Sequence, residues 1–100
     1  MLLQIPRLRR LIKRRYQCNA EHVRSKIVVE HAPDGSLWRG TVEVFDLSGH
    51  PEANRCYGWV EEANGEAIWH TWLNVPSVGS AEAAVRAMLA ERSVPADSFR

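Results

Sequence analysis

The chain has 100 residues, which is enough for one domain with a single core. Hydrophobic residues make up 45% and charged residues 25%, a balance that excludes disorder of the whole chain. A formal net charge of +1 hides a strong asymmetry, because residues 1–26 carry eight Lys and Arg against one acid, and the remainder carries five against eleven. A basic end of this kind is typical of contact with an anion, either a nucleic acid, a membrane surface or the acidic part of the same chain.

Residues 6–17 are predicted to form a basic helix. Pro6 suits its first position, and five apolar side chains recur at spacings of three and four, namely Ile5, Leu8, Leu11, Ile12 and Tyr16. Arginine and lysine occupy most of the remaining surface. Because like charges on one helix repel one another, this helix needs a core or a bound anion to hold it.

An antiparallel sheet is predicted over residues 25–74. Residues 18–25 are expected to be a loop or a helix end, and the apolar run at 25–31 a short strand that a turn at 32–36 follows. Alternating patterns predict longer strands at 37–47, 55–63 and 66–74. Asn64-Gly65 between the last two is the typical dipeptide of a type I′ hairpin turn.

A second helix is predicted at residues 80–92, with Ser80 as its N-cap, and residues 93–100 are expected to be a tail. Strands joined by short turns form a meander. The expected fold is therefore an α+β single domain over residues 1–100. It has two layers, a three- to four-stranded antiparallel meander and, on one face of it, both the N-terminal and the C-terminal helix.

The tripeptide Gly49-His50-Pro51 leads into the strand at 55–63, and Gly79-Ser80 leads into an alanine-rich helix. In this order of elements the chain resembles the double-stranded RNA-binding domain, in which a similar loop enters the second strand. The resemblance covers roughly residues 6–92 and implies an RNA-binding function. The family's lysine-rich start of the second helix is absent, since residues 80–86 contain no Lys and include Glu82. Contact with RNA is therefore expected from the first helix.

The main hypothesis is a non-enzymatic domain that binds nucleic acid electrostatically, with structured RNA favoured over DNA. Its predicted contacts are the basic residues of the N-terminal segment and one loop histidine: Arg7, Arg9, Arg10, Lys13, Arg14, Arg15, Arg24, Lys26 and His50. A solvated face of the helix, or its pairing with the chain's own acids, is the simpler alternative. A membrane surface is less expected, because the apolar stripe is short and the core needs it.

The alternative function is a protein-interaction module or a homodimer that uses an open, aromatic face of the sheet. Tyr57 and Trp59 share one side of their strand and are the pair predicted to be exposed there. Most of the four tryptophans are expected to be core, and any that are exposed on the sheet could stack nucleic-acid bases.

Enzymatic chemistry has no support in the sequence. There is no nucleophile elbow or glycine-rich phosphate loop, and the adjacent Glu61 and Glu62 point to opposite faces of a strand. The His and Cys spacings match no zinc motif, so no metal or cofactor is expected. Cys18 and Cys56 are expected to be free thiols, and the absence of a signal segment or an apolar run of membrane-spanning length predicts a cytoplasmic protein.

Overall fold

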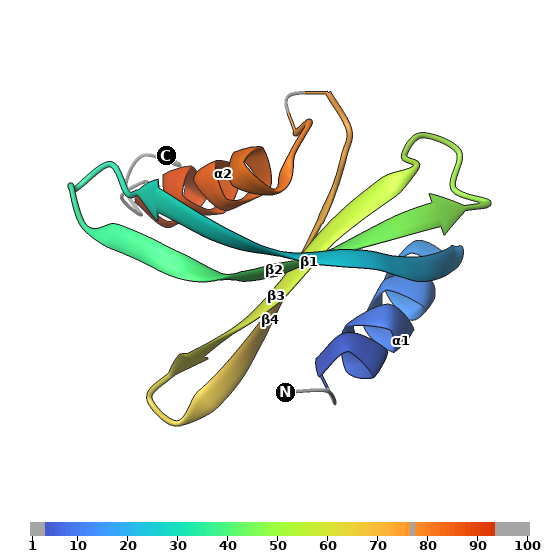
Figure 1. Ribbon diagram of the computed structural model, residues 1–100, viewed down its shortest axis with the longest axis horizontal. Coiled ribbons are helices and arrows are strands. Elements are labelled where there is room, and N and C mark those ends of the chain that lie inside the picture. The colour runs from blue at the N-terminus through green and yellow to red at the C-terminus, as the bar shows by residue number, and fades with distance from the viewer. Residues whose placement is uncertain (1–3, 77, 94–100) are drawn as a thin grey trace, which may run out of the picture.

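The computed structural model describes residues 4–76 and 78–93 and contains one four-stranded sheet with a helix at each end of the chain (Figure 1). The elements in chain order are α1 (Gln4–Tyr16), β1 (Asn19–His31), β2 (Leu37–Ser48), β3 (Arg55–Ala63), β4 (Glu66–Leu73) and α2 (Ala81–Ser93). All neighbouring strands are antiparallel, in the spatial order β1-β2-β3-β4. The predicted α+β fold with an antiparallel meander is therefore confirmed. Residues 94–100 of the expected tail lie outside the described residues.

Strand β1 begins earlier than the sequence predicted, because residues 19–25 pair with β2 instead of forming a loop. This polar segment has little strand propensity of its own, and its pairing from Asn19 opposite Ser48 supplies the structure. A register shift between His22 and Arg24 marks a bulge. Because the bulge adds one residue to the strand, the side chains after it point to the opposite face from the one that simple alternation predicts.

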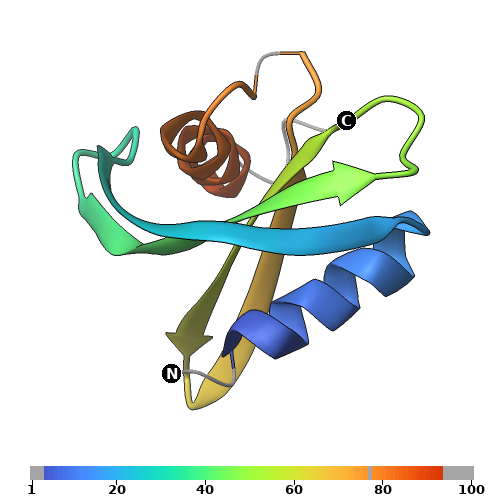
Figure 2. The same cartoon turned by 45° about the vertical axis from the view of Figure 1, so that its right-hand side comes forward.

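The two helices cover opposite faces of the sheet, so the prediction that both lie on one face of a two-layer fold is wrong. Figure 2 shows α1 and α2 on either side of the strands. The buried residues accordingly form two clusters, called the α1 cluster and the α2 cluster after the helix that each contains. Leu8 and Ile12 of α1 pack with Phe45 on one face, whereas α2 packs over Val42 and Val44 on the other.

The reason lies in the central strands, which are apolar on both faces. Residues 42–45 of β2 are buried in succession, although alternate side chains of a strand point in opposite directions. In β3, Cys56 belongs to the α1 cluster and Tyr57 to the α2 cluster. Strands of a sheet that is buried on both faces contain near-continuous apolar runs. Residues 56–60 of β3 form such a run in the sequence, whereas Glu43 interrupts the one in β2.

Close packing of α1 depends on Gly58 in β3. A Cβ atom at this position would lie 3.1 Å from Cδ2 of Leu8, which is tighter than ordinary contact. The missing side chain therefore leaves room for the helix on this face.

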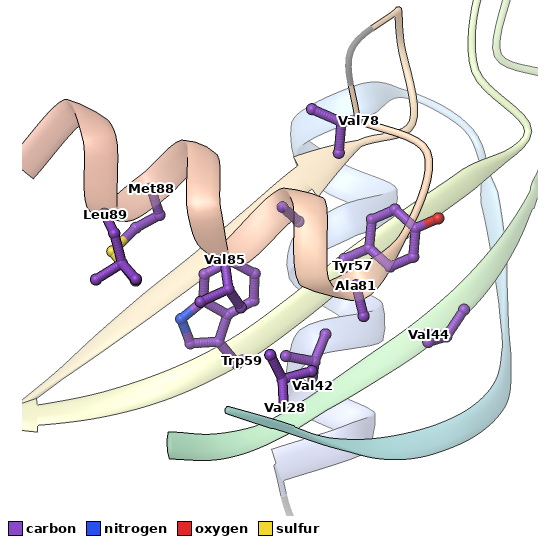
Figure 3. Packing of buried hydrophobic residues seen from close by; sticks show 11 residues of the cluster. Val28, Val42, Val44, Tyr57, Trp59, Val78, Ala81, Val85, Met88 and Leu89 are labelled. Carbon is purple, nitrogen blue, oxygen red and sulfur yellow. The ribbon is translucent and has the colours of Figure 1, made fainter. Parts of the chain in front are cut away.

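Helix α2 covers Tyr57 and Trp59, which point toward it from β3 (Figure 3). They are 3% and 1% exposed, so the predicted open aromatic face does not exist at these two residues. The prediction failed because α1 occupies the other face and leaves this one to α2. Three ion pairs also join α2 to the sheet, namely Lys26–Glu82 at 2.7 Å, Glu30–Arg86 at 3.2 Å and Glu61–Arg92 at 2.6 Å.

Two local predictions about chain reversal and helix capping are confirmed. Asn64 and Gly65 both have positive φ, 55° and 80°, as a type I′ turn requires. Ser80 Oγ accepts a hydrogen bond from the amide of Ala83 at 3.1 Å, which is the N-cap contact expected at the start of α2.

Candidate nucleic-acid interface

Helix α1 is fixed to the sheet along its length. Leu8 and Ile12 are fully buried beneath it. On one flank Arg9 Nε donates a hydrogen bond to the carbonyl oxygen of Ala20 at 2.7 Å. On the other flank, the hydroxyl of Tyr16 and Nη1 of Arg15 each lie 2.8 Å from Oγ1 of Thr71. These contacts fix the position of the helix and hold the side chains of Arg9 and Arg15.

The outward face of α1 carries Arg7, Arg10 and Arg14 at spacings of three and four residues. Side chains at these spacings lie on one face of a helix, and all three are exposed. Within residues 4–76 and 78–93, none of them has a carboxylate within ion-pair distance. Lys13, half-buried on the same helix, is likewise unpaired there. These cations therefore repel one another without internal compensation, and a bound anion would relieve that repulsion.

The sheet separates the charges of the molecule. On the α2 side, Glu30 and Glu61 already pair with arginines of α2. On the α1 side, β3 and β2 contribute Glu62, which is exposed, and Glu43, which is 7% exposed. Glu43 is occupied by His22 and Ser25. Because one sheet face receives the basic helix and the other most of the strand carboxylates, the α1 side is the positive side of the fold.

Two of the predicted contact residues lie on the other side. Arg24 is exposed and sits opposite Val44 in the β1–β2 register, which places it on the α2 face. Lys26 pairs with Glu82 of α2. The structure therefore brings together the basic residues of α1 and places Arg24 and Lys26 on the other face of the sheet. The bulge at Val23 causes this, since it reverses the facing of the residues after it.

His50 has a structural partner within its own loop. Its Nδ1 accepts hydrogen bonds from the amides of Glu52 at 3.1 Å and Ala53 at 3.0 Å. The ring also meets Tyr16 edge-on, with 6.2 Å between centroids. His50 thus lies at the C-terminal end of α1, where it shapes the loop and is half-buried.

A groove of about 500 Å³ runs between α1 and the edge strand β4. The lining residues come from both elements: Arg7, Leu11, Arg15, Ala67, Ile68 and Trp69. Trp69 is not among the predicted contact residues, although base stacking by exposed tryptophans was considered. Its face of β4 was readable from alternation, but its position beside two arginines depends on which sheet face α1 covers.

The described residues offer no assembled catalytic or metal centre. His22 Nε2 lies 2.8 Å from Glu43 Oε1, and Ser25 donates to that same oxygen, so the histidine is not placed to act on the serine. No group of three potential metal ligands occurs in the described part of the chain. Nor does any helix there have the length and apolar character needed to cross a membrane.

Comparison with known proteins found no matching family model, no matching curated protein and no matching solved structure. The resemblance to the double-stranded RNA-binding domain stays a prediction.

Proposed function

We propose that this protein binds nucleic acid through the outward face of α1, with RNA favoured over DNA, and that it does so without catalysing a reaction. The observation that carries this proposal is the row of Arg7, Arg10 and Arg14 on a docked helix, exposed and without carboxylate partners among the described residues. Arginines presented in this way neutralise phosphates and release counterions, which gives binding without sequence readout.

The burial of the apolar side of α1 favours a nucleic acid over a membrane surface. A helix that binds in a membrane interface inserts its apolar face among the lipids. Here Leu8 and Ile12 are fully buried against the sheet, so they are unavailable for insertion while the fold is intact. The charged face alone remains, and phosphate groups are its natural partner.

A salt titration tests the proposal. Fluorescence anisotropy would measure the affinity for labelled single-stranded RNA, duplex RNA and duplex DNA at about 50 and 200 mM salt, a range over which phosphate-driven binding weakens strongly. The double variant Arg10→Ala/Arg14→Ala is expected to bind more weakly and to reduce the slope of log K against log salt by about 2, or about 1 per lost phosphate contact.

The matched control is Arg24→Ala/Arg39→Ala, which removes two exposed arginines outside α1. It is expected to keep the wild-type slope. Equal affinities for wild type and the α1 variant would show that α1 is not the nucleic-acid surface.

A protein contact is the second candidate, and it rests on a different surface. Ile27 and Val29 of the edge strand β1 and Leu37 of β2 are 65%, 49% and 60% exposed and lie on one face by the strand register. An edge strand with exposed apolar side chains can pair with another chain. Sedimentation over a range of concentrations tests this, because Ile27→Lys should abolish any self-association that depends on β1.

A further inference from the structure

We propose that the groove between α1 and β4 accepts one unpaired nucleobase, which stacks against Trp69 while Arg7 and Arg15 hold the adjoining phosphates. This inference rests on the proposed function and narrows it to nucleic acid with unpaired nucleotides, such as a single strand or a loop. Bases within a duplex are already stacked and paired, so they cannot enter a side groove.

The first support is the state of Trp69. Its side chain is half-buried and packs against the α1 cluster, but it makes no ring–ring contact with any aromatic side chain of the described residues. In contrast, Trp59 is stacked on His70 and meets Trp38 edge-on. Trp69 therefore offers an anchored indole on which no other aromatic ring of the described residues is stacked. Base-stacking platforms use aromatic side chains held in this way.

The second support is the charge at the rim of the groove. Arg15 and Arg7 are both exposed and line the groove from α1. Arg15 is held by its hydrogen bond to Thr71 Oγ1, so its guanidinium is positioned before any ligand arrives. Leu11 lies one helical turn from each of these cations on α1, and Ala67 lines the groove from β4. An apolar slot with positive ends matches a nucleotide, which has an apolar ring face and an anionic phosphate.

The third support is size and access. The groove holds about 500 Å³, within the range of small-ligand pockets, and it opens at the edge of the sheet where β4 has no further strand beside it. A nucleic-acid strand could therefore follow the outward face of α1 and turn one base into the groove without displacing any strand.

The decisive probe is an oligonucleotide that keeps its phosphates and loses its bases. Anisotropy titrations would compare single-stranded RNA, the same RNA with abasic sites along its length, and duplex RNA. The natural strand is expected to bind roughly tenfold more tightly than the abasic strand, in line with stacking of one base. Equal affinity for the natural and abasic strands would contradict base binding in the groove and would leave the proposal of phosphate binding by α1 intact. Absence of binding to every probe would contradict both the proposed function and base binding in the groove.

Ala67→Gln supplies the protein side of the test. Ala67 is exposed in the groove, so a larger neutral side chain fills the space without changing the charge or the core. This variant should lose the preference for the natural strand and keep its affinity for the abasic one. Ala63→Gln is the matched control on the neighbouring strand, outside the groove lining, and should behave as wild type. Retention of the full tenfold preference in Ala67→Gln would contradict the proposal.

Discussion

Arg92, in the last turn of α2, donates a hydrogen bond from Nη2 to Oε1 of Glu61 in β3 at 2.6 Å. The other oxygen of this carboxylate accepts from Nε1 of Trp38 at 2.9 Å. His70 Nε2 also lies 2.7 Å from Oε1 but is not aligned for a hydrogen bond. A single carboxylate thus joins the end of α2 to three strands, and its ionisation bears on how firmly α2 is held.

Replacement of Glu61 by Gln should lower the free energy of unfolding at neutral pH. It should also make that free energy fall less when the solution is acidified. Burial raises the pKa of Glu61, but hydrogen bonds from Arg92 and Trp38 and the charges of Arg92 and His70 outweigh it and leave the pKa lowered. A carboxyl with a lower pKa in the folded state stabilises the fold above its unfolded pKa of about 4.3, and that stabilisation is lost as the pH falls through the folded pKa.

Denaturant unfolding at pH 7 and at acid pH would measure both effects. Glu61→Gln should cost about 1 kcal/mol at pH 7, and the loss between pH 7 and acid pH should be smaller than in wild type. Glu91→Gln, on the exposed side of α2, is the control and should leave the acid dependence unchanged. An unchanged acid dependence in Glu61→Gln would show that this carboxylate is not a source of acid sensitivity.

A side chain at Gly58 should displace α1. A Cβ atom there already lies 3.1 Å from Leu8, and the two methyl groups of valine would intrude further into the packed interface. Overpacking of this kind typically costs about 1–3 kcal/mol. Urea unfolding of Gly58→Val measures the cost, with Ala63→Val at an exposed position of β3 as the control. Unchanged stability and unchanged nucleic-acid affinity in Gly58→Val would argue against close packing of α1 on β3.

The two thiols should differ sharply in reactivity. Burial raises the pKa of Cys56 to about 12, and its side chain is fully enclosed. Cys18 is half-exposed, and both cysteines are free. Because the thiolate is the reactive species, a thiol reagent at pH 8 should titrate one cysteine rapidly in the native protein and the second only in denaturant. Cys18→Ser should abolish the rapid phase, and a rapid phase that survives in this variant would show that Cys56 is accessible.

Reversal of charge at Glu62 should strengthen nucleic-acid binding. Glu62 is the exposed carboxylate that β3 places on the α1 side, and it sits opposite Ala67 of the groove. Glu62→Lys should therefore raise the affinity severalfold at about 50 mM salt and less at about 200 mM, where screening is stronger. Glu91→Lys makes the same change in net charge on α2, and an equal gain in that variant would indicate a general effect of net charge.

Local chemistry made much of the fold predictable. Asn64-Gly65 specified the hairpin because its two residues tolerate positive φ. Strand alternation assigned Tyr57 and Trp59 to one face, and both belong to one buried cluster. The amphipathic pattern of α1 likewise identified the buried Leu8 and Ile12. These features depend on neighbours a few residues away, so the chain order alone contains them.

The layer assignment and the candidate site needed the tertiary structure. Alternation groups side chains by face, but it does not say which helix covers which face, and so Tyr57 and Trp59 were wrongly expected to be exposed. The bulge in β1 also separates Arg24 from the basic residues of α1, because one extra residue turns each later side chain of the strand to the opposite face. The distribution of Lys and Arg along the sequence by itself determined that one end of this protein is basic. Only long-range packing decided that the basic helix lies beside Trp69, since that neighbourhood joins segments more than fifty residues apart in the chain.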